Sequence, residues 1–216
     1  MKKTVFVLAL LGLGICAFAQ NGVIKQVNGQ VEIKRTGETA YAPAQAGDTV
    51  SGNTVISTGF RSFAVIEVGG ASIQVRPATR LTLTEIRSLD SEETLQMNLR
   101  SGSVRVDVAP PAGKRASTTI QSPSATASVR GTSFYFDTRN LRVTEGTVLF
   151  KGNRGYTIQV NAGSGSVVGW NGTASAPQST TGYQETSLAG WDFSAGTAGG
   201  RGAVPGPGFV DIVAEY

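Results

Sequence analysis

The chain has no histidine, and its single cysteine is Cys16. Imidazole is the usual general base of hydrolytic triads and the commonest transition-metal ligand, so its absence excludes most sites of both kinds. Cys16 lies inside an N-terminal apolar run, and a chain cut after Ala19 would contain no thiol, no disulfide and no cysteine metal site. We therefore expect no catalytic residues, no cofactor and no bound metal.

Charge is also sparse, because charged residues make up only 16% of the chain. The 19 basic residues outnumber the 15 acidic ones, and removing Lys2 and Lys3 leaves 17 basic residues that are scattered along the chain. A nucleic-acid-binding protein would show a concentrated basic stripe. The sequence therefore predicts no nucleic-acid partner.

The first residues have the layout of a secretory signal peptide. Two lysines precede an apolar run over Val5–Ile15, and small residues follow at the −3 and −1 positions of a cut. This run is shorter than the roughly 20 residues of a membrane-spanning helix, and no later stretch is apolar enough to span. We expect a periplasmic or secreted mature chain without a transmembrane helix. The expected cleavage positions are Ala17, Ala19 and Gln20.

A lipoprotein anchored through Cys16 is the weaker alternative, since a small residue usually precedes a lipidated cysteine and Ile15 stands there.

From Asn21 onward the sequence has many short alternating runs, almost no helical periodicity and abundant glycine. About 150 ordered residues suffice for one hydrophobic core. After Gly163 the chain becomes rich in small residues and proline, a composition typical of a loose segment. We predict a signal peptide at 1–19, an all-β domain at 20–169 and a low-complexity tail at 170–216. The alternating end of the chain, Val210 to Tyr216, is a possible docking strand.

Glycine-containing dipeptides mark the points where the alternation of apolar residues changes parity. Around Arg130-Gly131, for example, small and apolar residues occupy odd positions before the dipeptide and even positions after it. A two-residue hairpin explains the change, and so does a bulge or corner that rotates the strand; the pattern leaves both open. The other such dipeptides are Gly69-Gly70, Ser101-Gly102 and Glu145-Gly146.

At Asn28-Gly29 the sequence predicts a specific hairpin, because this dipeptide favours a type I′ turn. The turn would place Ile24 opposite Ile33 and Lys25 opposite Glu32.

Several segments in a fixed order resemble the FecR-type domain, a family named for the iron-dicitrate sensor of bacterial envelopes. The most distinctive segment is "SPSATASVRGTSFYF" (Ser122–Phe136), followed by "VTEGTVLF" (Val143–Phe150). The remaining segments are "QAGDTVSGNTVISTG" (Gln45–Gly59), "LRSGSVRV" (Leu99–Val106) and "VNAGSG" (Val160–Gly165). The matching signature positions are Gly59, Gly102, Pro123, Val129, Arg130, Gly131, Thr132, Phe134, Glu145 and Gly146.

The resemblance implies an extracytoplasmic all-β domain similar to a β-solenoid of short stacked strands and hairpins, with a β-sandwich as the alternative. In the best-known members, this domain receives a signal from an outer-membrane transporter. A membrane helix passes the signal to a cytoplasmic segment that controls a sigma factor. The present sequence is expected to lack those membrane and cytoplasmic parts, so the binding scaffold is what carries over.

The leading functional hypothesis is an exported, non-catalytic binding module for envelope sensing or protein–protein interaction, whose partner is an envelope protein or a glycan. Its specificity would reside in outward strand positions, and stacked units could bring Arg130 and Glu145 together as an ion pair. The outward candidates are Arg100, Arg105, Asp107, Arg139 and Arg142.

The alternatives are a surface or extracellular structural protein, an outer-membrane barrel and a glycan hydrolase that uses two carboxylates. The available acids are Asp48, Glu67, Glu85, Asp107 and Glu145.

Overall fold

The computed structural model describes residues 21–89, 92–109 and 112–180, which fall within one compact unit. Every regular element of these residues is a β-strand, so the predicted all-β class is confirmed. The predicted cleavage positions and the predicted docking strand at the end of the chain lie outside the described residues.

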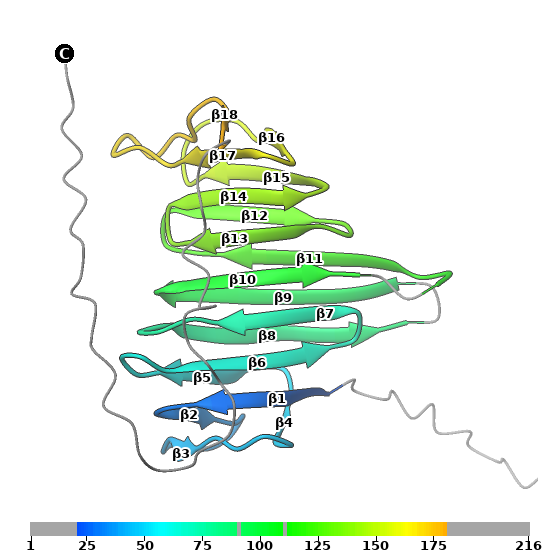
Figure 1. Ribbon diagram of the computed structural model, residues 1–216, viewed down its shortest axis with the longest axis vertical. Helices are drawn as coiled ribbons and strands as arrows, with labels where there is room; N and C mark the ends of the chain where they lie inside the picture. Colours follow the sequence, from blue (N-terminus) through cyan, green and yellow to red (C-terminus); the bar gives the residue numbers. More distant parts are fainter. Residues whose placement is uncertain (1–20, 90–91, 110–111, 181–216) are drawn as a thin grey trace, which may run out of the picture. The chain divides into compact units, whose positions relative to one another are not determined.

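The strands form two nine-stranded sheets, seen as a ladder of strands in Figure 1. Sheet A has the order β18 (Gln178–Ser179), β17 (Ser164–Val167), β14 (Asn140–Glu145), β13 (Ser133–Asp137), β10 (Ser103–Val108), β7 (Ala71–Val75), β6 (Phe63–Val68), β1 (Gly22–Asn28) and β4 (Thr49–Val50). Sheet B has the order β16 (Ile158–Asn161), β15 (Thr147–Gly152), β12 (Ala125–Val129), β11 (Arg115–Gln121), β9 (Glu92–Ser101), β8 (Arg80–Ser88), β5 (Thr54–Thr58), β2 (Val31–Lys34) and β3 (Ala42–Pro43).

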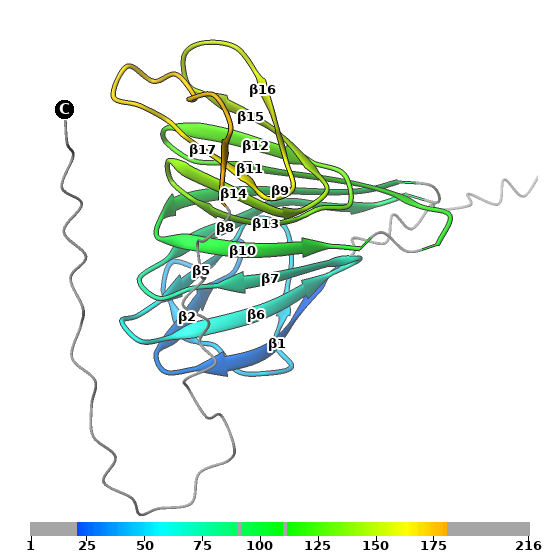
Figure 2. The same cartoon turned by 45° about the horizontal axis from the view of Figure 1, so that its top comes forward.

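One continuous hydrophobic core lies between the two sheets, which Figure 2 separates into two layers. Both sheets contribute alternate residues to it, as a half-buried strand surface requires. Phe136 of sheet A meets Phe150 of sheet B edge to face, with ring centroids 6.1 Å apart and an interplanar angle of 80°. Such aromatic pairs add about 0.5–1.5 kcal/mol beyond the burial of their area. Two sheets that share one core fit a β-sandwich, which was the alternative to a β-solenoid.

The parity changes predicted from the sequence are confirmed, and most of them occur where the chain passes from one sheet to the other. We call such a segment a crossing. At Gly102 the chain leaves β9 in sheet B and enters β10 in sheet A, and at Gly131 it passes from β12 to β13. The apolar residues on both sides of each crossing are buried. The parity changes because the second strand faces the same core from the opposite side.

The hairpin predicted at Asn28-Gly29 is wrong. Ile24 of β1 pairs with Ile66 in sheet A, whereas Ile33 of β2 pairs with Ile56 in sheet B. Asn28-Gly29 is therefore a crossing, since a turn with positive φ serves a crossing as well as a hairpin. Lys25 forms its ion pair with Glu67 of the neighbouring strand, at 2.9 Å, and not with Glu32.

Gly69-Gly70, in contrast, is a hairpin within sheet A, where Val68 pairs with Ala71 and Ile66 pairs with Ile73. A repeated solenoid coil is not confirmed. β9 and β11 are neighbours in sheet B and pair in parallel, while β10, which connects them in the chain, lies in sheet A. The three strands therefore form a single coil. Every other strand pairing among the described residues is antiparallel.

A buried hydroxyl group from a neighbouring crossing contacts the backbone next to the crossing glycine. The Ser62 Oγ accepts a hydrogen bond of 2.9 Å from the Gln30 amide, directly after Gly29. The Thr79 Oγ1 accepts one of 3.0 Å from the Ser103 amide, directly after Gly102. Both hydroxyl residues are only 1% exposed. The hydroxyls thus satisfy backbone groups that have no partner strand at the crossing.

We expect Gly102→Ala to destabilise the protein by about 2–4 kcal/mol, combining backbone strain with overpacking. Gly102 has φ +82°, and an added Cβ would lie 2.5 Å from the Thr79 Cα and 2.7 Å from the Ala78 carbonyl oxygen. The matched control is Gly37→Ala, where φ is +84° but no atom lies within 4 Å of the added Cβ; this change should cost only about 1–2 kcal/mol. Urea unfolding measures both, and equal losses would contradict close packing at the crossing.

Candidate functional site

The signature positions lie at turns and crossings and in the core. Gly59 and Gly102 belong to two crossings on either side of the crossing from β7 to β8, since the Ala78 amide donates to the Gly59 carbonyl and the Ser103 amide donates to the Thr79 Oγ1. Pro123 lies in the turn between β11 and β12. The structure brings the remaining signature residues together at two crossings, from β12 to β13 and from β14 to β15.

Thr132 is the centre of this second group and is 2% exposed. Its hydroxyl donates a hydrogen bond of 3.1 Å to the Thr147 carbonyl, directly after Gly146. An added Cβ on Gly146, where φ is +76°, would lie 2.9 Å from the Thr132 Oγ1. Val129 and Phe134 on either side are buried in the core. Thr132 thus supports a crossing through its hydroxyl, as Ser62 and Thr79 do.

Arg130 and Glu145 are the signature residues that are both charged and exposed. The predicted ion pair between them is not formed, because neither belongs to any salt bridge of the described residues. Glu145 pairs in register with Ser133 at an irregularity between β13 and β14. The two charges are therefore available to solvent.

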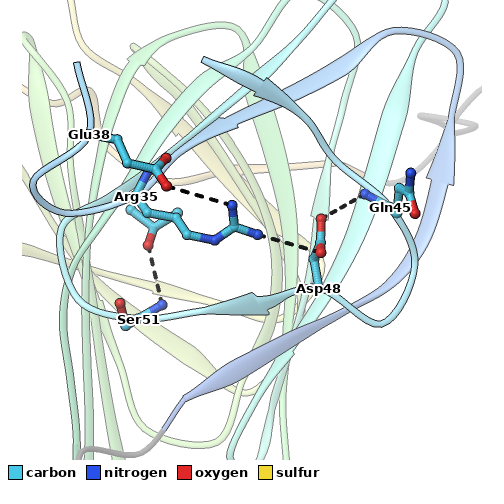
Figure 3. A network of polar contacts seen from close by, with 6 residues as sticks. Arg35, Glu38, Gln45, Asp48 and Ser51 are labelled. Atoms are coloured by element: carbon cyan, nitrogen blue, oxygen red, sulfur yellow. Dashed lines mark hydrogen bonds and ion pairs between the residues drawn. The ribbon is translucent and has the colours of Figure 1, made fainter. Parts of the chain in front are cut away.

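Four of the five acidic residues considered for glycan hydrolysis form ion pairs with basic residues, and the fifth, Glu145, is the exposed residue described above. The Asp48 carboxylate lies 3.4 Å from an Arg35 nitrogen and accepts a 2.9 Å hydrogen bond from the Gln45 amide (Figure 3). The remaining pairs are Glu67 with Lys25 at 2.9 Å, Glu85 with Arg87 at 2.6 Å and Asp107 with Arg105 at 3.4 Å. The geometry gives no support to a pair of cooperating carboxylates.

Within residues 21–89, 92–109 and 112–180, no group of three metal-ligating side chains comes together. The same residues contain no helix with the length and apolar character needed to cross a membrane.

The outer face of sheet A carries several arginine side chains around one tyrosine. Cross-strand pairing places Gln74, Arg105, Tyr135 and Arg142 in one row across β7, β10, β13 and β14. These residues alternate with buried core residues, so they face away from the core. We define the Tyr135 cluster as Arg76, Arg105, Asp107, Tyr135 and Arg142.

Tyr135 is the centre of the cluster. The Arg76 guanidinium lies 5.2 Å from the centroid of its ring, and the Arg142 guanidinium lies 6.0 Å from it. Arg105 is adjacent and pairs with Asp107 on its own strand. Cation–π contacts of this kind are worth about 0.5–1 kcal/mol at exposed sites. Two positive charges therefore lie next to one aromatic ring on the outer face of sheet A.

Of the outward residues predicted from the sequence, Arg105, Asp107 and Arg142 come together in this cluster. Arg100 lies exposed near the end of β9 in sheet B, and Arg139 lies in the turn between β13 and β14. Sequence analysis did not single out Arg76 or Tyr135. The parity of β13 could have identified Tyr135, because it lies between the buried Phe134 and Phe136.

A scan against protein-family models matches residues 54–167 with the model described as FecR protein. The chain belongs to the FecR family. The match begins at the first residue of β5 and ends at the last residue of β17, so the FecR region contains the Tyr135 cluster and both groups of crossings. No curated protein matches the chain.

Two solved structures are similar to this FecR protein, both from Parabacteroides distasonis ATCC 8503 and described as an anti-sigma factor, at 1.65 Å and 2.50 Å resolution. They share 15% and 16% sequence identity with it, and each has a TM-score of 0.47. The aligned part covers 58% of this chain and 59% of each of those chains.

We expect Thr132→Val to destabilise the FecR domain by about 1–3 kcal/mol, because it removes the hydroxyl that bonds to the Thr147 carbonyl and leaves that carbonyl with one partner fewer. Thr126→Val is the control, since Thr126 faces outward between the buried Ala125 and Ala127; it should change stability by less than about 0.5 kcal/mol. Thermal unfolding compares the two, and an unaffected Thr132→Val protein would refute the structural role of this hydroxyl.

Proposed function

We propose that the chain is an exported, non-catalytic FecR-type module that binds an envelope protein and takes part in envelope sensing. The Tyr135 cluster is the binding surface. Membership of the FecR family supports a role in sensing. The tyrosine and arginine side chains of the cluster support binding of a protein partner at this surface.

The observation that carries this proposal is that the guanidinium groups of Arg76 and Arg142 both lie near the Tyr135 ring on the outer face of sheet A. Tyrosine and arginine are enriched among the residues that dominate the energy of protein–protein interfaces. Tyr135 and its arginines are already oriented by a sheet and by each other, so binding loses less conformational entropy. Arg105 and Asp107 at one side of the ring offer both signs of charge to a partner.

In-cell crosslinking tests the surface. A photoreactive residue introduced at Gln74, in the same row as Tyr135, should capture an envelope protein, and Tyr135→Ala or Arg142→Glu should abolish the capture. Lys151→Glu is matched to Arg142→Glu in its change of charge, but Lys151 lies exposed on β15 of sheet B. It should leave the crosslink intact.

Two outcomes would contradict this proposal. Absence of any protein crosslink at Gln74, with the chain retained at the cell surface, would favour a structural surface protein. The same crosslinks in all variants would place the partner elsewhere on the molecule.

Release of the exported chain requires removal of the signal peptide, which we place before Gln20, at the Ala17-Phe18-Ala19 motif. We expect protein released by osmotic shock to begin at Gln20 and Ala19→Arg to block processing, because a large charged side chain replaces the small residue at the −1 position. Gln26→Ala, beyond the cut, should be processed normally. N-terminal sequencing of the released protein checks this, and release of the unprocessed Ala19→Arg chain would argue against this cut.

A further inference from the structure

A second surface feature, separate from the Tyr135 cluster, is a shallow hollow beside the loop that follows β17. We call it the Trp170 hollow. It is formed by the turn between β13 and β14, the turns that precede β12 and follow β15, and the loop from Val168 to Gly172. Its polar and aromatic lining consists of Ser124, Arg139, Asn153, Arg154, Trp170 and Asn171.

The Trp170 side chain is 96% exposed, although the loop that carries it is firmly attached. Val168 pairs with Ala174 across the loop, and the Gly169 amide donates to the Thr173 carbonyl at 3.0 Å. The Arg154 amide donates to the Gly172 carbonyl at 2.9 Å, which joins the loop to the turn after β15. Exposing a large aromatic side chain is unfavourable in water. A fixed loop that nevertheless exposes one indicates a contact surface.

Arg139 supports the indole from one side. Its guanidinium lies 4.2 Å from the centroid of the Trp170 ring. Its Nε and Nη2 donate hydrogen bonds of 2.9 Å and 2.6 Å to the Val168 carbonyl. This guanidinium is thus fixed by the same loop that presents the tryptophan.

The described lining of the hollow contains two arginines and no acidic residue. Asp137 is the acidic group nearest in sequence to Arg139, and its carboxylate accepts hydrogen bonds from the Arg139 amide and from the amide and side chain of Asn140. Asn153 and Asn171 add side-chain amides at the rim. The hollow therefore combines positive charge, amide donors and acceptors, and an exposed flat ring.

We propose that the Trp170 hollow binds an acidic saccharide, in which a sugar ring stacks on Trp170 and a uronate carboxylate is bound by Arg139 and Arg154. An indole offers a flat apolar face to the C–H groups of a pyranose ring. Guanidinium groups favour carboxylates through charge-assisted hydrogen bonds, and the asparagine amides match sugar hydroxyls. This inference is independent of the proposed protein-binding surface, and Trp170 lies outside the matched family region.

An acidic peptide would also satisfy the two arginines. The observations favour the saccharide because the described lining of the hollow carries two side-chain amides and one exposed aromatic ring.

The test measures binding of an oligogalacturonate to the full mature chain by isothermal titration calorimetry, with a neutral galactose oligosaccharide of the same length for comparison. We expect binding of the acidic oligosaccharide only, weakened by about tenfold or more in Trp170→Ala and in Arg154→Gln. Raising sodium chloride from about 0.05 M to about 0.5 M should weaken it further, because salt screens the carboxylate–guanidinium attraction.

Tyr156→Ala is the matched control, since Tyr156 is 91% exposed in the turn after β15 but does not line the hollow. It should bind like the unmodified chain. Binding that is lost equally in Tyr156→Ala, equal binding of the neutral oligosaccharide, or no saccharide binding together with binding of a poly-glutamate peptide would each overturn the proposal. Circular dichroism of each variant verifies that the sheets are intact.

Discussion

The structure depends on one constraint, which is that two sheets share a core while the chain passes repeatedly between them. At each crossing the backbone leaves one sheet before it has entered the other, so its amide and carbonyl groups lose their regular partners. Buried groups of this kind must be satisfied. Ser62, Thr79 and Thr132 provide the missing hydrogen bonds at three crossings, next to glycines with positive φ. The two-sheet arrangement therefore depends on the local backbone geometry and hydrogen bonds of the crossings.

This constraint explains which parts of the fold could be predicted from sequence. The parity of apolar residues identified the buried face of β9, β10, β12 and β13, because alternation reports directly on which side of a strand is buried. Parity could not identify partner strands. A hairpin and a crossing change parity in the same way, and Asn28-Gly29 suits both. The pairing of Ile24 with Ile66 and of Ile33 with Ile56 shows that Asn28-Gly29 is a crossing and not a hairpin. These pairings join residues far apart in the sequence, so they depend on long-range packing.

The Tyr135 cluster shows a similar limit. Its five members come from three strands and the end of a fourth, and Arg76 and Arg142 are 66 positions apart in the sequence. They lie close together because of the register in which these strands pair. Sequence analysis could state that Arg105 and Arg142 face outward, because their neighbours are apolar. It could not state that both lie next to one tyrosine. The hypothesis about Arg130 and Glu145 was wrong for the same reason: equal spacing from a glycine does not fix the distance between a side chain in a crossing and one at the end of a strand.

The signature residues and the outward-facing residues occupy different parts of this protein. Thr132, Gly131 and Gly146 maintain a crossing, and Val129 and Phe134 fill the core, so these residues contribute to the scaffold. Function has to be argued from the site and not from the fold. Outward strand positions and turn residues can differ between proteins of one architecture without altering the core, since they alternate with the buried residues. Binding chemistry is therefore expected on the outer faces and loops, where the Tyr135 cluster and the Trp170 hollow lie.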